Sequence, residues 1–224
     1  MNKGVLYIVA TPIGNLKDIT LRALDKLKKV DLIACEDTRT TKKLLKNFNI
    51  KTETISLHQH SRLNKIDEII NRLNNGKKVA LVTDSGTPAI SDPGSRLIRE
   101  TTKYDKIKVV PIPGPSALTT ALSISGAQSK NILFLGFIPH KKRRKSLLRE
   151  ISIELSKGRV VVFYESPHRI KKTIGELKEY KIDAKIVIAR ELTKKFEDIK
   201  YTTLQDIQPE EIVGKGEFTV IIYP

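Results

Sequence analysis

The feature that most constrains the fold is an alternation of short apolar runs and longer amphipathic stretches along the chain. In the first half, the apolar runs are rich in β-branched residues, and the segments between them carry apolar residues at helical spacing. This alternation is typical of βαβ units, in which two parallel strands are joined by a helix. It predicts strands over residues 4–11, 31–35, 78–83 and 108–112, and helices over residues 18–30, 38–48, 61–74 and 94–102. We therefore expect an α/β fold with a largely parallel sheet.

The segment Pro111-Ile112-Pro113-Gly114-Pro115 interrupts this pattern, because three prolines and a glycine are incompatible with a helix interior or a central strand. We interpret it as a rigid connection between an α/β domain over residues 1–113 and a second over residues 114–224. A helix capped by Ser116 is expected to end at Gly126. Further strands are predicted over residues 132–137, 159–165, 185–190 and 217–223, and further helices over residues 143–155 and 168–180.

The chain is strongly basic, with 41 Lys and Arg against 25 Asp and Glu and a net charge of +16. Such a charge favours a polyanionic partner, and nucleic acid is the leading candidate. A Lys-rich composition that only solvates the surface is the alternative, and charge alone does not decide between the two.

The sequence also bounds the cellular setting. Cys35 is the single cysteine, which excludes an intramolecular disulfide and a zinc site of the usual cysteine-rich kind, so no metal is expected. No apolar run approaches the roughly 20 residues of a membrane span. Because the sequence starts directly with a strand-like run, we expect no signal peptide and a cytoplasmic protein with no membrane partner.

Three loops rich in Gly and Pro follow predicted strands, where open α/β sheets bind ligands. The longest, residues 83–94, contains Asp84, Ser85, Gly86 and Thr87, whose small or polar side chains let a ligand approach the backbone. The other two are residues 11–16 and residues 113–116. None has the spacing of a dinucleotide fingerprint or a P-loop. Three such loops suggest one cleft for a small molecule, although each alone can also be a plain connection.

Two turns carry acidic residues directly after predicted strands. In Cys35-Glu36-Asp37-Thr38-Arg39, either carboxylate can act as a general base, or Asp37 or Thr38 can simply cap the next helix. In Glu165-Ser166-Pro167-His168-Arg169, a carboxylate, an imidazole and a guanidinium lie within five residues. A helix start with Ser166 as cap and Pro167 at its first position explains two of those five residues.

A run of five cations, Lys141-Lys142-Arg143-Arg144-Lys145, opens a predicted helix. Basic residues at a helix N-terminus oppose the helix dipole, so they need another reason to be there. Binding of a phosphate backbone supplies that reason, and a solvated helix start is the alternative.

Taken together, six ordered motifs resemble the tetrapyrrole-methylase superfamily and, within it, the bacterial family of small-subunit ribosomal RNA 2′-O-methyltransferases I. The resemblance spans nearly the whole chain. It rests on residues 9–16 with residues 18–23, Glu36 to Thr40, Asp84 to Gly94, Pro113 to Ala117, Gly136 to Pro139, and Glu165 to Arg169. Members of that family usually extend past the position of Tyr223, and this sequence ends at Pro224.

The resemblance implies a homodimer of two-domain subunits of the tetrapyrrole-methylase (class III methyltransferase) type, with S-adenosylmethionine bound in a cleft between the domains. It also implies methylation of a cytidine 2′-hydroxyl in the decoding region of 16S rRNA in the small ribosomal subunit. The cofactor-binding residues would be Pro12, Asp84, Ser85, Gly86, Thr87, Pro113, Gly114, Pro115 and Ser116, with parts of the second domain's strands.

Methyl transfer to a hydroxyl requires alignment of the acceptor and removal of its proton. The candidates for that catalytic role are Glu36, Asp37, Glu165 and His168. The candidates for phosphate binding are Arg39, Arg169 and the run Lys141, Lys142, Arg143, Arg144 and Lys145. Two alternatives remain open: a methylase of a small tetrapyrrole-like substrate, and a non-catalytic RNA-binding protein.

Overall fold

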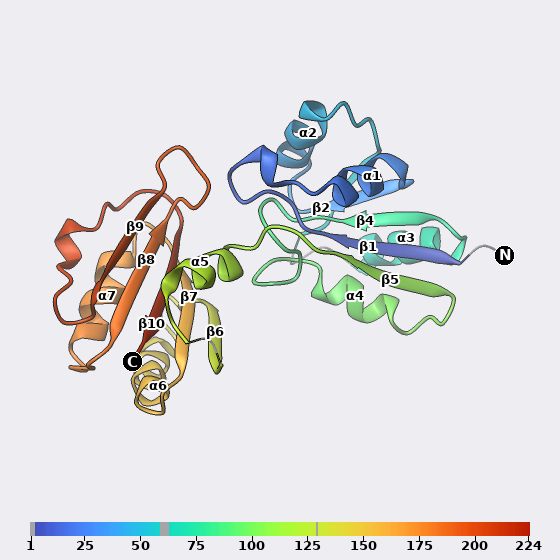
Figure 1. Ribbon diagram of the computed structural model, residues 1–224. Coiled ribbons are helices and arrows are strands. Elements are labelled where there is room, and N and C mark those ends of the chain that lie inside the picture. Colours follow the sequence, from blue (N-terminus) through green and yellow to red (C-terminus); the bar gives the residue numbers. More distant parts are fainter. Residues whose placement is uncertain (1–2, 59–62, 129) are drawn as a thin grey trace. The chain divides into compact units, whose positions relative to one another are not determined.

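The computed structural model describes residues 3–58, 63–128 and 130–224 (Figure 1). The chain divides into two compact units, an N-terminal unit, Met1–Ser116, and a C-terminal unit, Ala117–Pro224. The sequence predicts the boundary after Pro113, and the division lies three residues later, after Ser116. Pro115 stays with the N-terminal unit because its carbonyl oxygen accepts a hydrogen bond from Thr87 Oγ1 at 3.1 Å.

The N-terminal unit is built on a five-stranded parallel sheet in the order β3-β2-β4-β1-β5. Its strands are β1 (Gly4–Val9), β2 (Leu32–Cys35), β3 (Thr54–Ser56), β4 (Lys78–Leu81) and β5 (Ile107–Ile112). Its helices are the 3₁₀ turn η1 (Leu16–Asp18), α1 (Leu21–Lys29), α2 (Thr38–Asn47), α3 (Leu63–Asn74) and α4 (Ser95–Thr101). The predicted parallel α/β sheet is confirmed, with β3 added as a short edge strand.

Helices cover both faces of this sheet, as a parallel sheet requires. Ala23 and Leu27 of α1 and Leu45 of α2 pack on one face. Apolar residues of α3 and Leu97 of α4 pack on the other. The strands are parallel, so their carboxyl ends lie at a single edge, and the loops after β1, β2, β4 and β5 meet there. The expected start of α3 at residue 61 lies outside the described residues.

The C-terminal unit has a mixed sheet in the order β6-β7-β10-β8-β9, in which only β6 and β7 pair in parallel. Its strands are β6 (Ile132–Phe137), β7 (Val160–Glu165), β8 (Lys185–Arg190), β9 (Asp198–Thr203) and β10 (Phe218–Tyr223). Its helices are α5 (Ala117–Ser125), α6 (Arg144–Ser156), α7 (Ile170–Lys178) and the 3₁₀ turn η2 (Pro209–Glu211). The sequence did not predict β9, because none of its residues is buried.

The faces of the mixed sheet are covered unequally. Buried residues of α6 and α7, among them Leu148, Ile151 and Ile174, form one core with β7, β8 and β10. On the other face lies α5, where the Tyr223 hydroxyl donates to Ser125 O at 2.9 Å. Helix α5 ends as predicted before Gly126, which has a φ of +71°.

Candidate functional site

Two of the three Gly- and Pro-rich loops of the N-terminal unit are joined through their backbones. Thr11, after β1, and Gly86, after β4, exchange amide hydrogen bonds of 2.9 and 3.1 Å. The Thr11 hydroxyl also donates to Thr83 O at 3.1 Å, and Thr11 is almost fully buried. Residues that are 72 and 75 positions apart in sequence therefore hold each other in place.

The third loop, after β5, is attached to the same assembly. Besides the bond from Thr87 to Pro115, Gly114 lies so close to Ala10 that an added Cβ would stand 3.1 Å from the Ala10 Cβ. We call residues 11–13, 84–87 and 113–116 the loop platform. It unites the segments that contain all the predicted cofactor-binding residues, including buried Pro12.

The loop between β4 and α4 has a demanding backbone conformation. Gly86 has a φ of +84°, and two residues with side chains, Ala89 and Ser91, have φ values of +67° and +61°. Left-handed backbone at such residues is unfavourable and persists only where the surroundings enforce it, as often occurs at functional sites. The backbone of this loop is therefore held in its conformation by the surrounding structure.

Asp84 contributes a carboxylate to the platform. Its Oδ1 accepts the backbone N–H of Asp37 at 3.1 Å, which ties the turn after β2 to the loop after β4. Among the residues that the structure describes, no partner is recorded for Asp84 Oδ2 or for the Ser85 hydroxyl. These two oxygens are available to a ligand.

Asp37 is occupied as a helix cap. Its carboxylate accepts the backbone N–H of Arg39 at 2.8 Å and pairs with the Arg39 guanidinium, with Nη2 and Oδ2 at 2.7 Å. Hydrogen bonds from the side chain and the backbone of Arg39 lower the pKa of Asp37 to about 2. The capping interpretation holds for this residue. A carboxylate with so low a pKa is a poor proton acceptor.

Glu36 differs from its neighbour. It is half-buried, and among the described residues it accepts one hydrogen bond, a long one of 3.4 Å donated by Thr83 Oγ1. Burial raises the pKa of Glu36, and the nearby Asp84 carboxylate raises it further. A raised pKa brings a carboxylate closer to the value that suits a general base at neutral pH.

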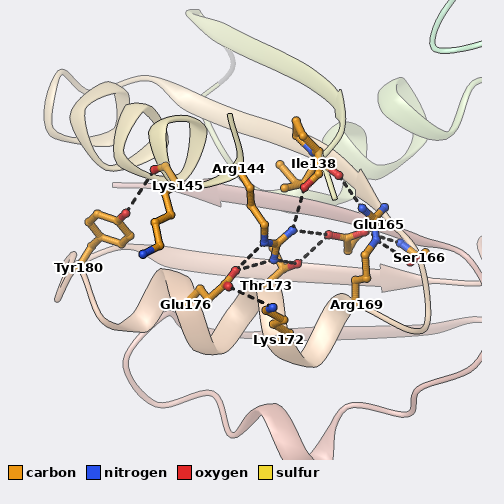
Figure 2. Close-up of polar contacts among 11 residues, drawn as sticks. Ile138, Arg144, Lys145, Glu165, Ser166, Arg169, Lys172, Thr173, Glu176 and Tyr180 are labelled. Atoms are coloured by element: carbon orange, nitrogen blue, oxygen red, sulfur yellow. Dashed lines mark hydrogen bonds and ion pairs between the residues drawn. The ribbon is translucent and has the colours of Figure 1, made fainter. Parts of the chain in front are cut away.

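In the C-terminal unit, Glu165 at the end of β7 is the centre of a buried polar network (Figure 2). One of its oxygens, Oε1, accepts the backbone N–H of Ser166 and lies 2.8 Å from Nη2 of Arg169. The other, Oε2, accepts the Thr173 hydroxyl at 2.6 Å and lies 3.9 Å from Nη1 of Arg144. This buried carboxylate has short contacts with three groups and a longer ion pair with a fourth, so Glu165 does not suit the catalytic role that the sequence allowed.

The two arginines connect this carboxylate to the turn after β6. Arg169 donates to Ile138 O at 2.8 Å, and Arg144 donates to Pro139 O at 3.3 Å (Figure 2). Arg144 also pairs with Glu176, with its Nε 2.8 Å from Oε2. His168 lies in the turn between β7 and α7 and is exposed, and helix α7 begins after it, at Ile170.

The basic run is divided by this network. Lys141, Lys142, Arg143 and Lys145 are exposed, whereas the Arg144 side chain is only 8% exposed. The expectation that Arg144 contacts RNA at the surface is therefore wrong. Arg169 is also largely internal, with 20% of its side chain exposed. Helical periodicity gave a usable signal for Arg144, because it shares a stripe with Leu148, Ile151 and Leu155.

Other residues of these sites had no motif to mark them. Thr83 and Thr173 act through single hydroxyls, and Glu176 lies in a helix interior among ordinary surface charges. Within residues 3–58, 63–128 and 130–224, no cluster of three or more His, Cys, Asp or Glu is arranged to hold a metal ion. No helix in the described part of the chain is long and apolar enough to cross a membrane.

Known sequences are similar to this chain over most of its length. The profile of a family described as Tetrapyrrole (Corrin/Porphyrin) Methylases matches residues 5–208. A protein of Vibrio cholerae named Ribosomal RNA small subunit methyltransferase I is 46% identical, over 98% of this chain and 77% of the relative. Proteins of the same name are 41% identical in Bacillus subtilis, over 98% and 75%, and 47% identical in Thermotoga maritima, over 85% and 84%.

Solved structures share the fold. The methyltransferase CobJ superposes with a TM-score of 0.71 at 16% identity, over 98% of this chain and 94% of CobJ. A diphthine synthase superposes with a TM-score of 0.74 at 14% identity, over 98% and 89%. The match to the family profile and the near-full-length identity to its members lead to one assignment. This chain belongs to the tetrapyrrole methylase family, within the group of ribosomal RNA small subunit methyltransferases I.

Proposed function

We propose that this protein transfers a methyl group from S-adenosylmethionine to the 2′-hydroxyl of a cytidine in 16S rRNA. The observation that carries the proposal is the loop platform, in which Asp84 Oδ2 and the Ser85 hydroxyl have no partner among the described residues. The relatives of the chain are named as small-subunit rRNA methyltransferases. A homodimer in the cytoplasm, acting on 16S rRNA or the small ribosomal subunit, is part of the same proposal.

The residues of the platform fit this cofactor chemically. S-adenosylmethionine carries hydroxyl and ammonium donors, which match a carboxylate oxygen such as Asp84 Oδ2. The glycines of the platform leave backbone groups approachable, and the hydrogen bonds among the loops fix these groups before a ligand arrives. Pro12, Gly86 and Thr87, together with residues 113–116, would then surround the ligand.

The chemistry divides between the cofactor and the chain. When bound, the cofactor supplies a methyl group that is already activated by the positive charge on its sulfur. The residues of the protein must align the hydroxyl and accept its proton, since a neutral hydroxyl is a poor nucleophile. Of the four candidates, we assign the role of proton acceptor to Glu36, because its pKa is raised and the one hydrogen bond that its carboxylate accepts from the described residues is long. His168 is exposed, and we keep it as the second candidate.

The exposed cations supply the contacts to RNA in this proposal. Arg39 has a side chain that is 86% exposed and is already oriented by Asp37. Lys141, Lys142, Arg143 and Lys145 are exposed and have no recorded ion pair in the described part of the chain. Phosphate binding by such residues releases counterions and makes the affinity depend on salt.

The direct test is transfer of labelled methyl from S-adenosylmethionine to small ribosomal subunits that lack the modification, followed by mapping of the labelled nucleotide. Label in a 2′-O-methyl group of 16S rRNA is the expected result. Binding of the cofactor without transfer to RNA would favour a small tetrapyrrole-like substrate. Binding of RNA without cofactor binding would favour the non-catalytic RNA-binding protein.

The platform can be tested separately through Asp84→Ala. We expect this variant to fold normally and to lose calorimetrically detectable binding of S-adenosylmethionine, because the carboxylate that accepts the ligand's donors is gone. Asp105→Ala, at another surface aspartate of the N-terminal unit, is the matched control. Undiminished binding by a folded Asp84→Ala protein would remove Asp84 from the site.

A further inference from the structure

A groove on the outer side of α6 is not explained by the proposed reaction. It has a volume of about 480 Å³ and is lined by Lys145, Ser146, Arg149, Glu150, Ile153 and Tyr180. The opposite stripe of the same helix, which includes Leu148 and Ile151, is buried in the core. The groove therefore lies between the solvent-facing side of α6 and the turn that follows α7.

The two cations of this groove are placed where they do not stabilise α6. Lys145 and Arg149 are one turn apart on α6, where like charges destabilise a helix, and Lys145 also opposes the dipole at the helix start. In the described part of the chain, neither of them has a recorded ion pair. Glu150 is the one anion that lines the groove, so cations outnumber it.

An aromatic ring completes the groove. Tyr180 is 37% exposed, and its hydroxyl donates a weak 3.5 Å hydrogen bond to Lys145 O, which holds the ring beside the first turn of α6 (Figure 2). Ile153 adds an exposed apolar side chain, at 43%. Cations beside an exposed ring are typical of surfaces for single-stranded nucleic acid, where bases stack on aromatic faces and phosphates lie near basic side chains.

We propose that this Tyr180 groove binds an unpaired stretch of RNA, with a base stacked on Tyr180 and phosphates near Lys145 and Arg149. The groove is continuous along the chain with the exposed cations Lys141 to Arg143, which precede α6. Glu150 is suited to accept a hydrogen bond from the amino group of a base. The inference rests on the proposed function in taking RNA as the partner, and it adds a binding surface on α6 that recognises unpaired nucleotides.

A single tryptophan provides a specific reporter, because the natural chain has none. In Tyr180→Trp, addition of a short single-stranded RNA should quench the indole emission, whereas a duplex of the same length should not. Tyr104→Trp is the matched control, since Tyr104 is 41% exposed in the N-terminal unit, and it should show no quenching. Absence of quenching in the Tyr180→Trp protein, or equal quenching by the duplex, would overturn the stacking proposal.

Affinity measurements provide an independent test. Tyr180→Leu should weaken binding of the single-stranded RNA about 5- to 100-fold, the usual effect of losing one stacked base, and Tyr180→Phe should retain the affinity. Lys145→Glu with Arg149→Glu should weaken binding and reduce its salt dependence, whereas Lys106→Glu with Lys108→Glu should not. Wild-type affinity in Tyr180→Leu, or equal competition by anionic phospholipid vesicles, would refute the inference.

Methyl transfer by the same proteins separates the two proposals. If the wild-type protein methylates small subunits while Tyr180→Leu binds RNA normally, the groove inference fails and the proposed function stands. If RNA quenches the Tyr180→Trp protein but the wild-type protein transfers no methyl group, the proposed function fails and the groove stands.

Discussion

The turns after β2 and β7 have similar sequences and different structures. Each places a glutamate at the end of a strand and an arginine three or four residues later. After β2, the arginine pairs with Asp37 at the surface, and Glu36 remains lightly engaged with a raised pKa. After β7, the glutamate is buried, and both of its oxygens have close partners. The degree of burial and the number of partners therefore separate the two turns. The carboxylate of Glu36 is available for chemistry, whereas that of Glu165 stabilises the structure.

The largest expected effect is the loss of stability when Glu165, the buried glutamate of the two, is replaced. Glu165→Ala should lower the free energy of unfolding by about 3–5 kcal/mol, because it leaves Arg169 without its buried carboxylate and Arg144 with one partner fewer. Urea denaturation measures this quantity. Glu179→Ala, at an exposed glutamate just after α7, is the control and should change little. A loss below about 1 kcal/mol in Glu165→Ala would mean that the two turns do not differ in the way described.

Glu36→Gln should have the opposite profile, with near-normal stability and a kcat lowered on the order of 100-fold, because the proton acceptor is lost. In the wild-type protein, activity should fall as the pH drops through the raised pKa of Glu36, where the carboxylate becomes protonated. That acid limb should be absent from the residual activity of Glu36→Gln. An unchanged acid limb in the variant would assign the proton to another group, with His168 next to be tested.

The basic run extends the comparison between buried and exposed charges, because Arg144 is held inside the Glu165 network while the residues before it are exposed. Replacing Lys141, Lys142 and Arg143 with Gln should reduce the slope of log affinity for RNA against log salt by about 2, if each residue contacts one phosphate. Cofactor binding should not change. A slope equal to that of the wild-type protein would return these residues to the role of solvated surface charges.

The smallest expected effect concerns Asp37, whose pKa in the folded protein is about 2, below the ordinary 3.8. A carboxyl group whose pKa is lowered by folding stabilises the folded protein at pH values above its ordinary pKa. For Asp37, this contribution is lost as the pH falls from 3.8 toward 2. Wild-type protein should therefore be slightly more stable than Asp37→Asn at neutral pH, with the difference shrinking in that acid range. Thermal denaturation at several pH values tests this, and a difference that grows in acid would contradict it.

The sequence predicts the parallel sheet of the N-terminal unit well, because buried strands such as β2 and β4 are continuous apolar runs bounded by turns. It predicts β9 poorly, since the strand pairs only at the edge of the mixed sheet and has no buried residue. The sequence also identifies both acidic turns, but it does not predict that Glu165 is buried and Glu36 is only half-buried. The difference depends on partners outside the two motifs, such as Thr83 for Glu36, 47 residues away, and Thr173 for Glu165, eight residues away.

The hydrogen bonds of the loop platform also determine when it can form. Thr11 must find Gly86, and Thr87 must find Pro115, so the platform needs contacts across nearly the whole N-terminal unit. Contacts of such high sequence separation form late, because they require closure of long loops. During synthesis, a nascent chain therefore lacks the platform until Pro115 has emerged, and a ligand of the platform would stabilise the completed unit rather than its folding intermediates.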